Sequence, residues 1–175
     1  MPAHSPGTLP PAWVIAESAI HGRGLFASRA IAAGERIVDY RGEKITKAES
    51  ARRATTQAAI AHEKGIGVVY TVSLDDEYDL DGSALDNPAR YANHACSPNC
   101  ELHYTSGTLW LIAVHDIAAG AELTFDYSYD LRDYFAHPCR CGTAGCAGYI
   151  VRADLRMKLR AHLARARRHT RTLSP

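Results

Sequence analysis

The sequence predicts a mostly-β domain of the α+β class that carries one or two helices. Short segments with apolar side chains at alternate positions recur along the chain, and turns containing glycine, proline or asparagine separate them. Two longer segments without glycine or proline are expected to be helical. No strand leads through a glycine-rich loop into a helix, which argues against a Rossmann-type fold.

The first third of the chain predicts strands and one helix. Strands are expected in residues 13–18, 24–31 and 36–42, with a turn at Ala32–Glu35. Residues 47–64 are rich in alanine and predict a helix with a weak apolar face.

An acid-rich hairpin is expected next, formed by strands at 68–74 and 77–82. Its acids lack the glycine and the terminal glutamate of a calcium-binding loop. We therefore interpret them as solvated residues that could attract a basic peptide, namely Asp75, Asp76, Asp79 and Asp81.

The centre of the chain predicts a helical turn and three further strands. Asn87 and Pro88 open a turn that extends to Asn93, and strands at 101–104 and 109–114 are joined by a turn at Ser106–Gly107. After a small turn containing Gly120, residues 123–127 form the last expected strand.

The C-terminal segment predicts a basic helix over residues 154–169. Leu155, Leu159 and Leu163 fall on one stripe, which would pack against the domain. Residues 152–175 contain eight Lys/Arg and one acid, a local charge of +7, so the rest of the chain carries −6. This tail could contact nucleic acid or chromatin; a solvated helix packed through its leucines is the alternative.

Length and composition suit one domain that resides inside a cell. The 175 residues contain no run of about 18 apolar residues, so no membrane span is expected. Residues 1–12 resemble a flexible, proline-rich leader rather than a secretory signal. We expect a cytoplasmic location in a bacterium or a nuclear one in a eukaryote, with a secreted effector as an alternative.

Three of the five cysteines form a candidate metal site. Cys139, Cys141 and Cys146 follow the pattern C-x-C-x4-C among glycines, which suits a structural, tetrahedral zinc ion. The fourth ligand would be Cys96 or Cys100. The alternatives are three unligated thiols, or an oxidised pair with one thiol left over.

Four further motifs precede the cysteines in order: HGRGLFA at 21–27, DYRGE at 39–43, RYANHACSPNC at 90–100 and ELTFDY at 122–127. This series resembles a SET-domain protein-lysine methyltransferase with a post-SET zinc loop. The resemblance covers residues 13–151 and implies a β-clip fold, in which two of these segments cross in a pseudoknot. We accordingly expect four parts: a leader (1–12), a SET domain (13–135), a post-SET zinc loop (136–151) and a basic helical tail (152–175).

The resemblance also implies roles for individual residues. S-adenosyl-L-methionine would be bound by Gly22, Arg23, Gly24, Arg90, Asn93, His94 and Tyr149. Cys96 would be the fourth ligand of one structural zinc ion. A protein or peptide lysine, such as one in a histone tail, would be the methyl acceptor.

Three aromatic residues are implied to act at the lysine. Tyr127 corresponds to the catalytic tyrosine, Tyr40 would line the same channel, and Phe125 suggests room for di- or trimethylation. Ala95 departs from the family, which usually has serine there. Taken singly, these aromatics fit ordinary strand positions, and a binding module without catalysis is the alternative to an enzyme.

Overall fold

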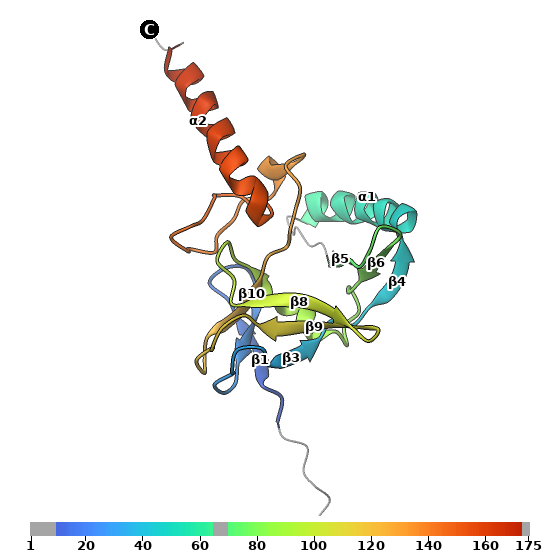
Figure 1. Ribbon diagram of the computed structural model, residues 1–175. Helices are drawn as coiled ribbons and strands as arrows, with labels where there is room; N and C mark the ends of the chain where they lie inside the picture. Colours follow the sequence, from blue (N-terminus) through green and yellow to red (C-terminus); the bar gives the residue numbers. More distant parts are fainter. Residues whose placement is uncertain (1–9, 65–69, 173–175) are drawn as a thin grey trace, which may run out of the picture.

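The computed structural model describes residues 10–64 and 70–172, and within these ranges it has ten strands, two α-helices and three short 3₁₀ helices (Figure 1). The strands form three small sheets of four, three and three strands. The predicted mostly-β class with two helices is therefore confirmed. Neither helix in this part of the chain is long and apolar enough to cross a membrane.

A four-stranded sheet joins segments from both ends of the main domain in the order β1-β2-β10-β7. Leu25 and Leu123 are partners across β2 and β10, and both are fully buried. β10 pairs antiparallel with β2 and parallel with β7. The strands are β1 (Trp13–Glu17), β2 (Arg23–Ala27), β7 (Asn93–His94) and β10 (Glu122–Phe125).

The expected helical turn before β7 is shorter than predicted. The 3₁₀ helix η1 (Pro88–Tyr91) ends two residues before Asn93, which lies in a strand. Pairing with β10 pulls Asn93 and His94 into extended backbone, so the prediction that the turn reaches Asn93 is wrong.

The second sheet contains β3 (Arg36–Asp39), β9 (Thr108–Ala113) and β8 (Cys100–Thr105) in that order. The predicted hairpin β8–β9 is confirmed. Ser106 and Gly107 have φ of 52° and 81°, as a two-residue hairpin turn of the primed type requires.

The third sheet contains β4 (Glu43–Thr46), β6 (Tyr78–Asp81) and β5 (Thr71–Ser73), and it leads directly into α1 (Lys47–Lys64). β4 was not expected from the sequence. The N–H of Glu49 donates to the Thr46 hydroxyl at 3.2 Å, the first half of a capping box that begins the helix. Residues 68–69 of the expected strand at 68–74 lie outside the described residues.

The acidic hairpin is not a uniformly solvated surface. Asp79 and Asp81 are 8% and 4% exposed. Asp79 pairs with Lys47, and Asp81 lies 2.7 Å from the Arg53 guanidinium, so both cations come from α1. The interpretation of these two acids as solvated residues that attract a peptide is therefore wrong, because buried carboxylates need a paired charge.

A second small core holds the C-terminal segment. The buried residues Ala147, Val151 and Leu159 are surrounded by partly buried neighbours, which include Leu155 and Leu163. The predicted leucine stripe is confirmed. The 3₁₀ helix η3 (Ala153–Leu155) precedes α2 (Arg156–Thr172), whose far end extends away from the body of the molecule in Figure 1.

The two residues directly before β1 are hydrogen-bonded to the main domain. The carbonyls of Pro11 and Ala12 accept hydrogen bonds from the Ser28 hydroxyl and N–H at 2.7 and 3.0 Å, and Ala12 is buried. Both residues fall within the expected leader at 1–12, of which residues 1–9 lie outside the described part.

Candidate functional site

The parallel pair β7–β10 places the residues of two sequence motifs side by side. Asn93 is opposite Thr124, and His94 is opposite Phe125. Asn99 continues the pairing along β10, because its side chain donates to the Glu122 carbonyl at 2.8 Å and accepts from the Thr124 N–H at 2.8 Å. Residues expected to bind a cofactor therefore adjoin those expected to act in catalysis.

The amide nitrogen of Asn93 lies in a cluster of oxygen atoms from two segments, residues 18–23 and β10. It is 3.2 Å or less from four acceptors: Ser18 Oγ, the His21 and Arg23 carbonyls, and Glu122 Oε1. An amide nitrogen has two protons and cannot satisfy four acceptors. The cluster has the composition of a binding site for an ammonium group, which has three.

The two glycines of the first motif are required for different reasons. Gly22 has φ of +49°, a conformation that side chains rarely adopt. A Cβ on Gly24 would collide with the Glu122 carboxylate. A glycine at position 24 was expected because it leaves space for a cofactor. The contact with Glu122 is a second reason why a larger residue does not fit there.

Arg90 and Arg23 stack on aromatic rings beside this cluster. The Arg90 guanidinium lies 4.0 Å from the Tyr70 ring centre and 5.7 Å from that of Tyr91, and it donates to the Ser83 carbonyl. Arg23 lies 5.1 Å from the same Tyr91 ring. Tyr91 thus contacts both arginines that are expected near the cofactor.

Aromatic side chains gather around Tyr127. Its ring centre lies 5.0 Å from that of Phe125 and 5.8 Å from that of Tyr129. The Tyr127 hydroxyl donates to the Ala92 carbonyl at 3.0 Å, and the Tyr40 hydroxyl donates to the Tyr70 carbonyl at 2.8 Å. The three aromatic residues expected at the lysine therefore belong to buried or half-buried parts of the same core.

Burial keeps these phenols neutral. It raises the pKa of Tyr129 to about 12, and it raises the pKa of Tyr40 and Tyr127 still further. Each hydroxyl consequently stays protonated throughout the neutral and moderately alkaline range. None of them can serve as a ready base.

Three residues of the site were not singled out from the sequence: Tyr129, Tyr70 and Ser18. Tyr129 continues the two-residue alternation of Phe125 and Tyr127, and that signal could have found it. Tyr70 and Ser18 have no local signal for a role at the site, because their partners are distant in sequence. Glu122 lies in the ELTFDY motif, but no role in binding or catalysis was expected for it.

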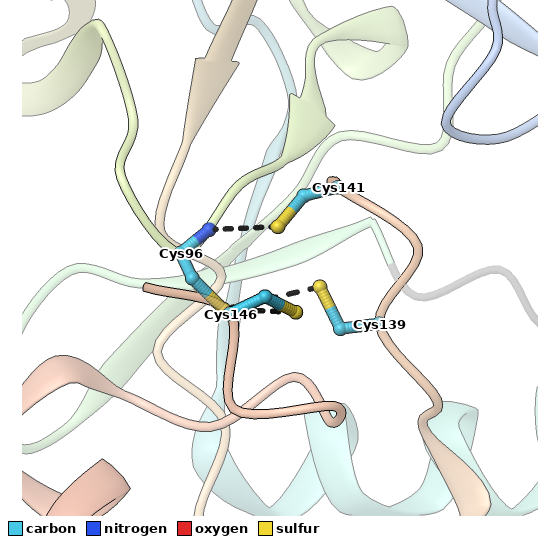
Figure 2. A group of neighbouring side chains, drawn as sticks. All are labelled: Cys96, Cys139, Cys141 and Cys146. Carbon is cyan, nitrogen blue, oxygen red and sulfur yellow. Dashed lines mark hydrogen bonds between the residues drawn. The ribbon is translucent and has the colours of Figure 1, made fainter. Parts of the chain in front are cut away.

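Four sulfur atoms converge where the C-terminal loop meets β7 (Figure 2). The Sγ atoms of Cys96, Cys139, Cys141 and Cys146 all lie within 4.8 Å of one another. Cys96 Sγ is 3.9 Å from Cys139 Sγ and 4.0 Å from Cys146 Sγ. Tetrahedral ligands with metal–sulfur bonds of about 2.3 Å would stand about 3.8 Å apart, so the four cysteines fit such an ion.

Cys100 is not part of this group. Its thiol is fully buried on β8 and contacts Asn99 Oδ1 at 3.5 Å, and burial raises its pKa to about 12. The fourth position, which the spacing left open, is thereby occupied by Cys96.

Hydrogen-bond donors surround the sulfurs. The N–H of Cys96 donates to Cys141 Sγ at 3.5 Å, and the N–H of Gly148 donates to Cys146 Sγ at 3.3 Å. Burial opposes ionisation of Cys141, but the Cys96 amide and the Thr143 hydroxyl outweigh it and lower the Cys141 pKa to about 6. Ionisation is thus favoured at Cys141, whereas burial raises the pKa of Cys96 and of Cys139.

Arg156, at the start of α2, fastens this loop to the main domain. Its guanidinium donates to Asp126 at 2.6 Å, to the Val151 carbonyl at 3.0 Å and to the Cys96 carbonyl. The Arg156 and Asp126 side chains are 13% and 20% exposed, so the ion pair is largely shielded from water.

Tyr149 and His94 are the last two residues that were expected to bind the cofactor. Tyr149 packs edge-on against Tyr134 at 5.0 Å in the C-terminal core. His94 is buried, and burial lowers its pKa to about 4, so its ring is neutral near pH 7. Its Nδ1 accepts the Tyr127 N–H at 3.2 Å.

The chain is similar to known proteins over most of its length. The family model described as "SET domain" matches residues 22–128. "Histone-lysine N-methyltransferase, H3 lysine-4 specific" of Candida albicans is 36% identical over 141 residues, which cover 77% of this chain and 13% of that protein. The protein of the same description from Saccharomyces cerevisiae is 35% identical over 143 residues, 78% of this chain and 13% of its own.

A third relative has a different name and a longer chain. "Histone-lysine N-methyltransferase trithorax" of Drosophila melanogaster is 34% identical over 137 residues, 76% of this chain and 4% of that protein. The chain therefore spans only a small part of the length of the relatives it matches.

Replacing the two buried thiols separately should distinguish a ligand from a packing residue. Loss of a group that only hydrogen-bonds to a metal ligand lowers metal affinity by about 10–100-fold. Cys96→Ser should lower it by more, because this change removes a ligand itself. Cys100→Ser, the matched control, should keep the metal. Metal analysis of the dialysed proteins measures this, and equal losses would mean that Cys96 is not the fourth ligand.

Proposed function

The chain belongs to the SET-domain family, and from this we propose that it transfers a methyl group from S-adenosyl-L-methionine to the ε-amine of a lysine in a protein substrate. One observation carries the proposal: an ammonium-type cluster of acceptors around Asn93 adjoins the aromatic group around Tyr127. The first suits the amino-acid part of the cofactor, and the second suits the lysine. The two lie on the same strand pair.

The acceptor cluster would hold the α-ammonium of the cofactor. The His21 and Arg23 carbonyls and the Glu122 carboxylate supply three oxygens, and a rotated Asn93 amide would present its own oxygen as a fourth. The backbone of Gly22 and Gly24 would approach the methionine part. The other residues implied by the family resemblance would contact the rest of the cofactor. The His94 backbone would contact the adenine, Arg90 would lie beside the cofactor pocket, and Tyr149 would cover it.

Transfer requires a neutral amine, because an ammonium has no lone pair. A lysine in water has a pKa of about 10.4, and an aromatic-walled site lowers it by removing water from the charge. The cofactor supplies an electrophilic methyl group on a positively charged sulfur. Its charge would lower the lysine pKa further, and the proton could leave through water before transfer.

Tyr127 would orient the amine as a hydrogen-bond acceptor. Its hydroxyl proton is directed to the Ala92 carbonyl, so only the oxygen lone pairs remain for the lysine or for the polarised methyl C–H groups. The raised pKa keeps it from acting as the base. Its contribution is therefore placement, with Tyr40 on the wall of the same channel.

A basic peptide could approach beside Tyr129. An open cavity of about 410 Å³ is lined there by Tyr129, Asp130, Arg132, Asp133 and His137. Two carboxylates at its wall suit a substrate with positive charges near the target lysine. Because the relatives are named for lysine 4 of histone H3, a histone tail is the first substrate to examine.

We further propose that the ion at the four cysteines is zinc with a structural role. Four thiolates leave no open position for chemistry. The ion would tie the loop that ends at Tyr149 to β7 through Cys96, and so order one side of the cofactor site.

The central experiment measures transfer of labelled methyl from S-adenosyl-L-methionine to histones and a panel of other proteins. Tyr127→Phe should reduce kcat by about 100-fold or more, since misplacement of a reacting group costs this much, while cofactor affinity stays unchanged by calorimetry. Tyr104→Phe, an exposed tyrosine on β8, is the control and should match wild type.

Two results would count against an enzyme. Transfer to no protein, together with absent cofactor binding, would favour a binding module that keeps only the fold. A Tyr127→Phe variant with wild-type kcat would remove Tyr127 from the mechanism.

Phe125 should set the number of methyl groups added. It is 7% exposed and lies against Tyr127, and it has no hydroxyl to hold a water where further methyl groups must fit. Mass spectrometry should find di- or trimethyllysine with the wild-type chain and a shift toward monomethyllysine with Phe125→Tyr. Strictly monomethyl product from the wild type would contradict this role.

We also propose that α2 contacts nucleic acid through its charges. Its sequence contains no acid, Lys158 and Arg165 are exposed, and its far end stands clear of the body (Figure 1). A helix of this length presents basic side chains over about 25 Å, a span that can follow a phosphate backbone.

Charge removal on α2 tests this contact better than a long truncation, which would also remove Arg156 and Leu159. Lys158→Gln with Arg165→Gln should weaken binding to duplex DNA at low salt and reduce the salt dependence by about two phosphate contacts. Lys44→Gln on β4 is the control. Unchanged binding by the double variant would rule out the contact.

A further inference from the structure

The His94 side chain lies between the aromatic site and the four cysteines. Its ring is 5.5 Å from the Tyr127 ring and only 3% exposed. Nδ1 faces the Tyr127 N–H at 3.2 Å, and Nε2 faces Cys96 Sγ at 3.6 Å. One rigid ring thus contacts the backbone of one site and a sulfur of the other.

The first contact decides where the ring proton lies. A backbone N–H can only donate, so Nδ1 must accept with its lone pair, and a neutral imidazole then has its proton on Nε2. Two acceptors compete for a proton on the ring: Asp126 is 3.7 Å from Nδ1, too far for a hydrogen bond, and the Phe125 carbonyl already accepts the Ala95 N–H at 3.3 Å. The Nε2–H is therefore directed toward Cys96.

The second contact gives that proton an acceptor. Cys96 Sγ belongs to the four-sulfur group, whereas Arg156 reaches only the Cys96 carbonyl. A metal-bound thiolate keeps negative charge and accepts N–H groups, as the sulfurs of Cys141 and Cys146 already do from the backbone. His94 would add a side-chain donor to this set.

We propose that the His94 side chain is a positioning residue that couples the metal site to Tyr127. Through Nε2–H it stabilises the metal-bound Cys96 thiolate, and through Nδ1 it holds the Tyr127 amide, and with it the phenol. This role is separate from the backbone role that the family assigns to the residue. Only the part of the inference that concerns Tyr127 rests on the proposed function; the contact with the metal site does not.

Two variants test the two ring nitrogens separately. His94→Asn places an amide oxygen near the position of Nδ1 but is too short to reach Cys96, while His94→Gln places an amide N–H near the position of Nε2. The Asn variant should release metal to a chromogenic chelator about 10-fold or more faster than wild type, the usual cost of losing an outer-shell donor. The Gln variant should release it close to the wild-type rate and lose kcat instead, with KM little changed.

Equal release by wild type and both variants would overturn the coupling. Metal release does not depend on methylation, so it is informative even if no substrate is found and the proposed function fails.

The wild-type protein offers a test that does not depend on the folding of a variant. In cadmium-substituted, isotopically labelled protein, NMR should find the His94 proton on Nε2, with scalar coupling to the metal across the N–H···S contact. A proton on Nδ1, or an Nε2 bound directly to the metal, would overturn the proposal.

Discussion

The parallel pairing of β7 with β10 is the contact on which the rest of the site depends. It is only two residues long on the β7 side, and the Asn99 side chain extends it by bonding to two backbone groups of β10. Because strand side chains alternate, the pair directs Asn93 toward the oxygen cluster and leaves His94 to face the cysteines. Two residues adjacent in sequence thereby serve two different sites.

Polar contacts across this junction join residues that are distant in sequence. Glu122 meets Asn93 and Ser18, while Arg156 joins Asp126 to the carbonyl of Cys96. The cluster around Asn93 consists of hydroxyl, carbonyl and carboxylate oxygens, which under the proposed function would face the ammonium of the cofactor. The C-terminal helix brings its own cation inward at Arg156, and Arg160 donates to the Gly145 carbonyl, whereas Lys158 and Arg165 are exposed.

The sequence predicted what depends on local pattern. Alternation indicated most strands, the Ala-rich segment indicated α1, and Cys139, Cys141 and Cys146 were assigned from spacing alone. Local pattern did not predict what depends on distant partners, and Cys96 joined the three other cysteines only through the family resemblance. β4 is recognisable only beside β6, Asp79 and Asp81 look solvated until α1 covers them, and Ser18 meets Glu122 across 104 residues. Nonlocal pairing has no signature in a single chain.

The arrangement of the four cysteines has a consequence for the order of folding. Three ligands lie close together, but Cys96 is 50 residues from Cys146, and closing a loop of that size costs entropy on the order of 3 kcal/mol plus a constant. During synthesis β7 and β10 both emerge before Cys139, so their pairing can absorb that cost before the last thiols appear. A metal ion would then fasten a junction that is already formed, and its late arrival would mark completion of the domain.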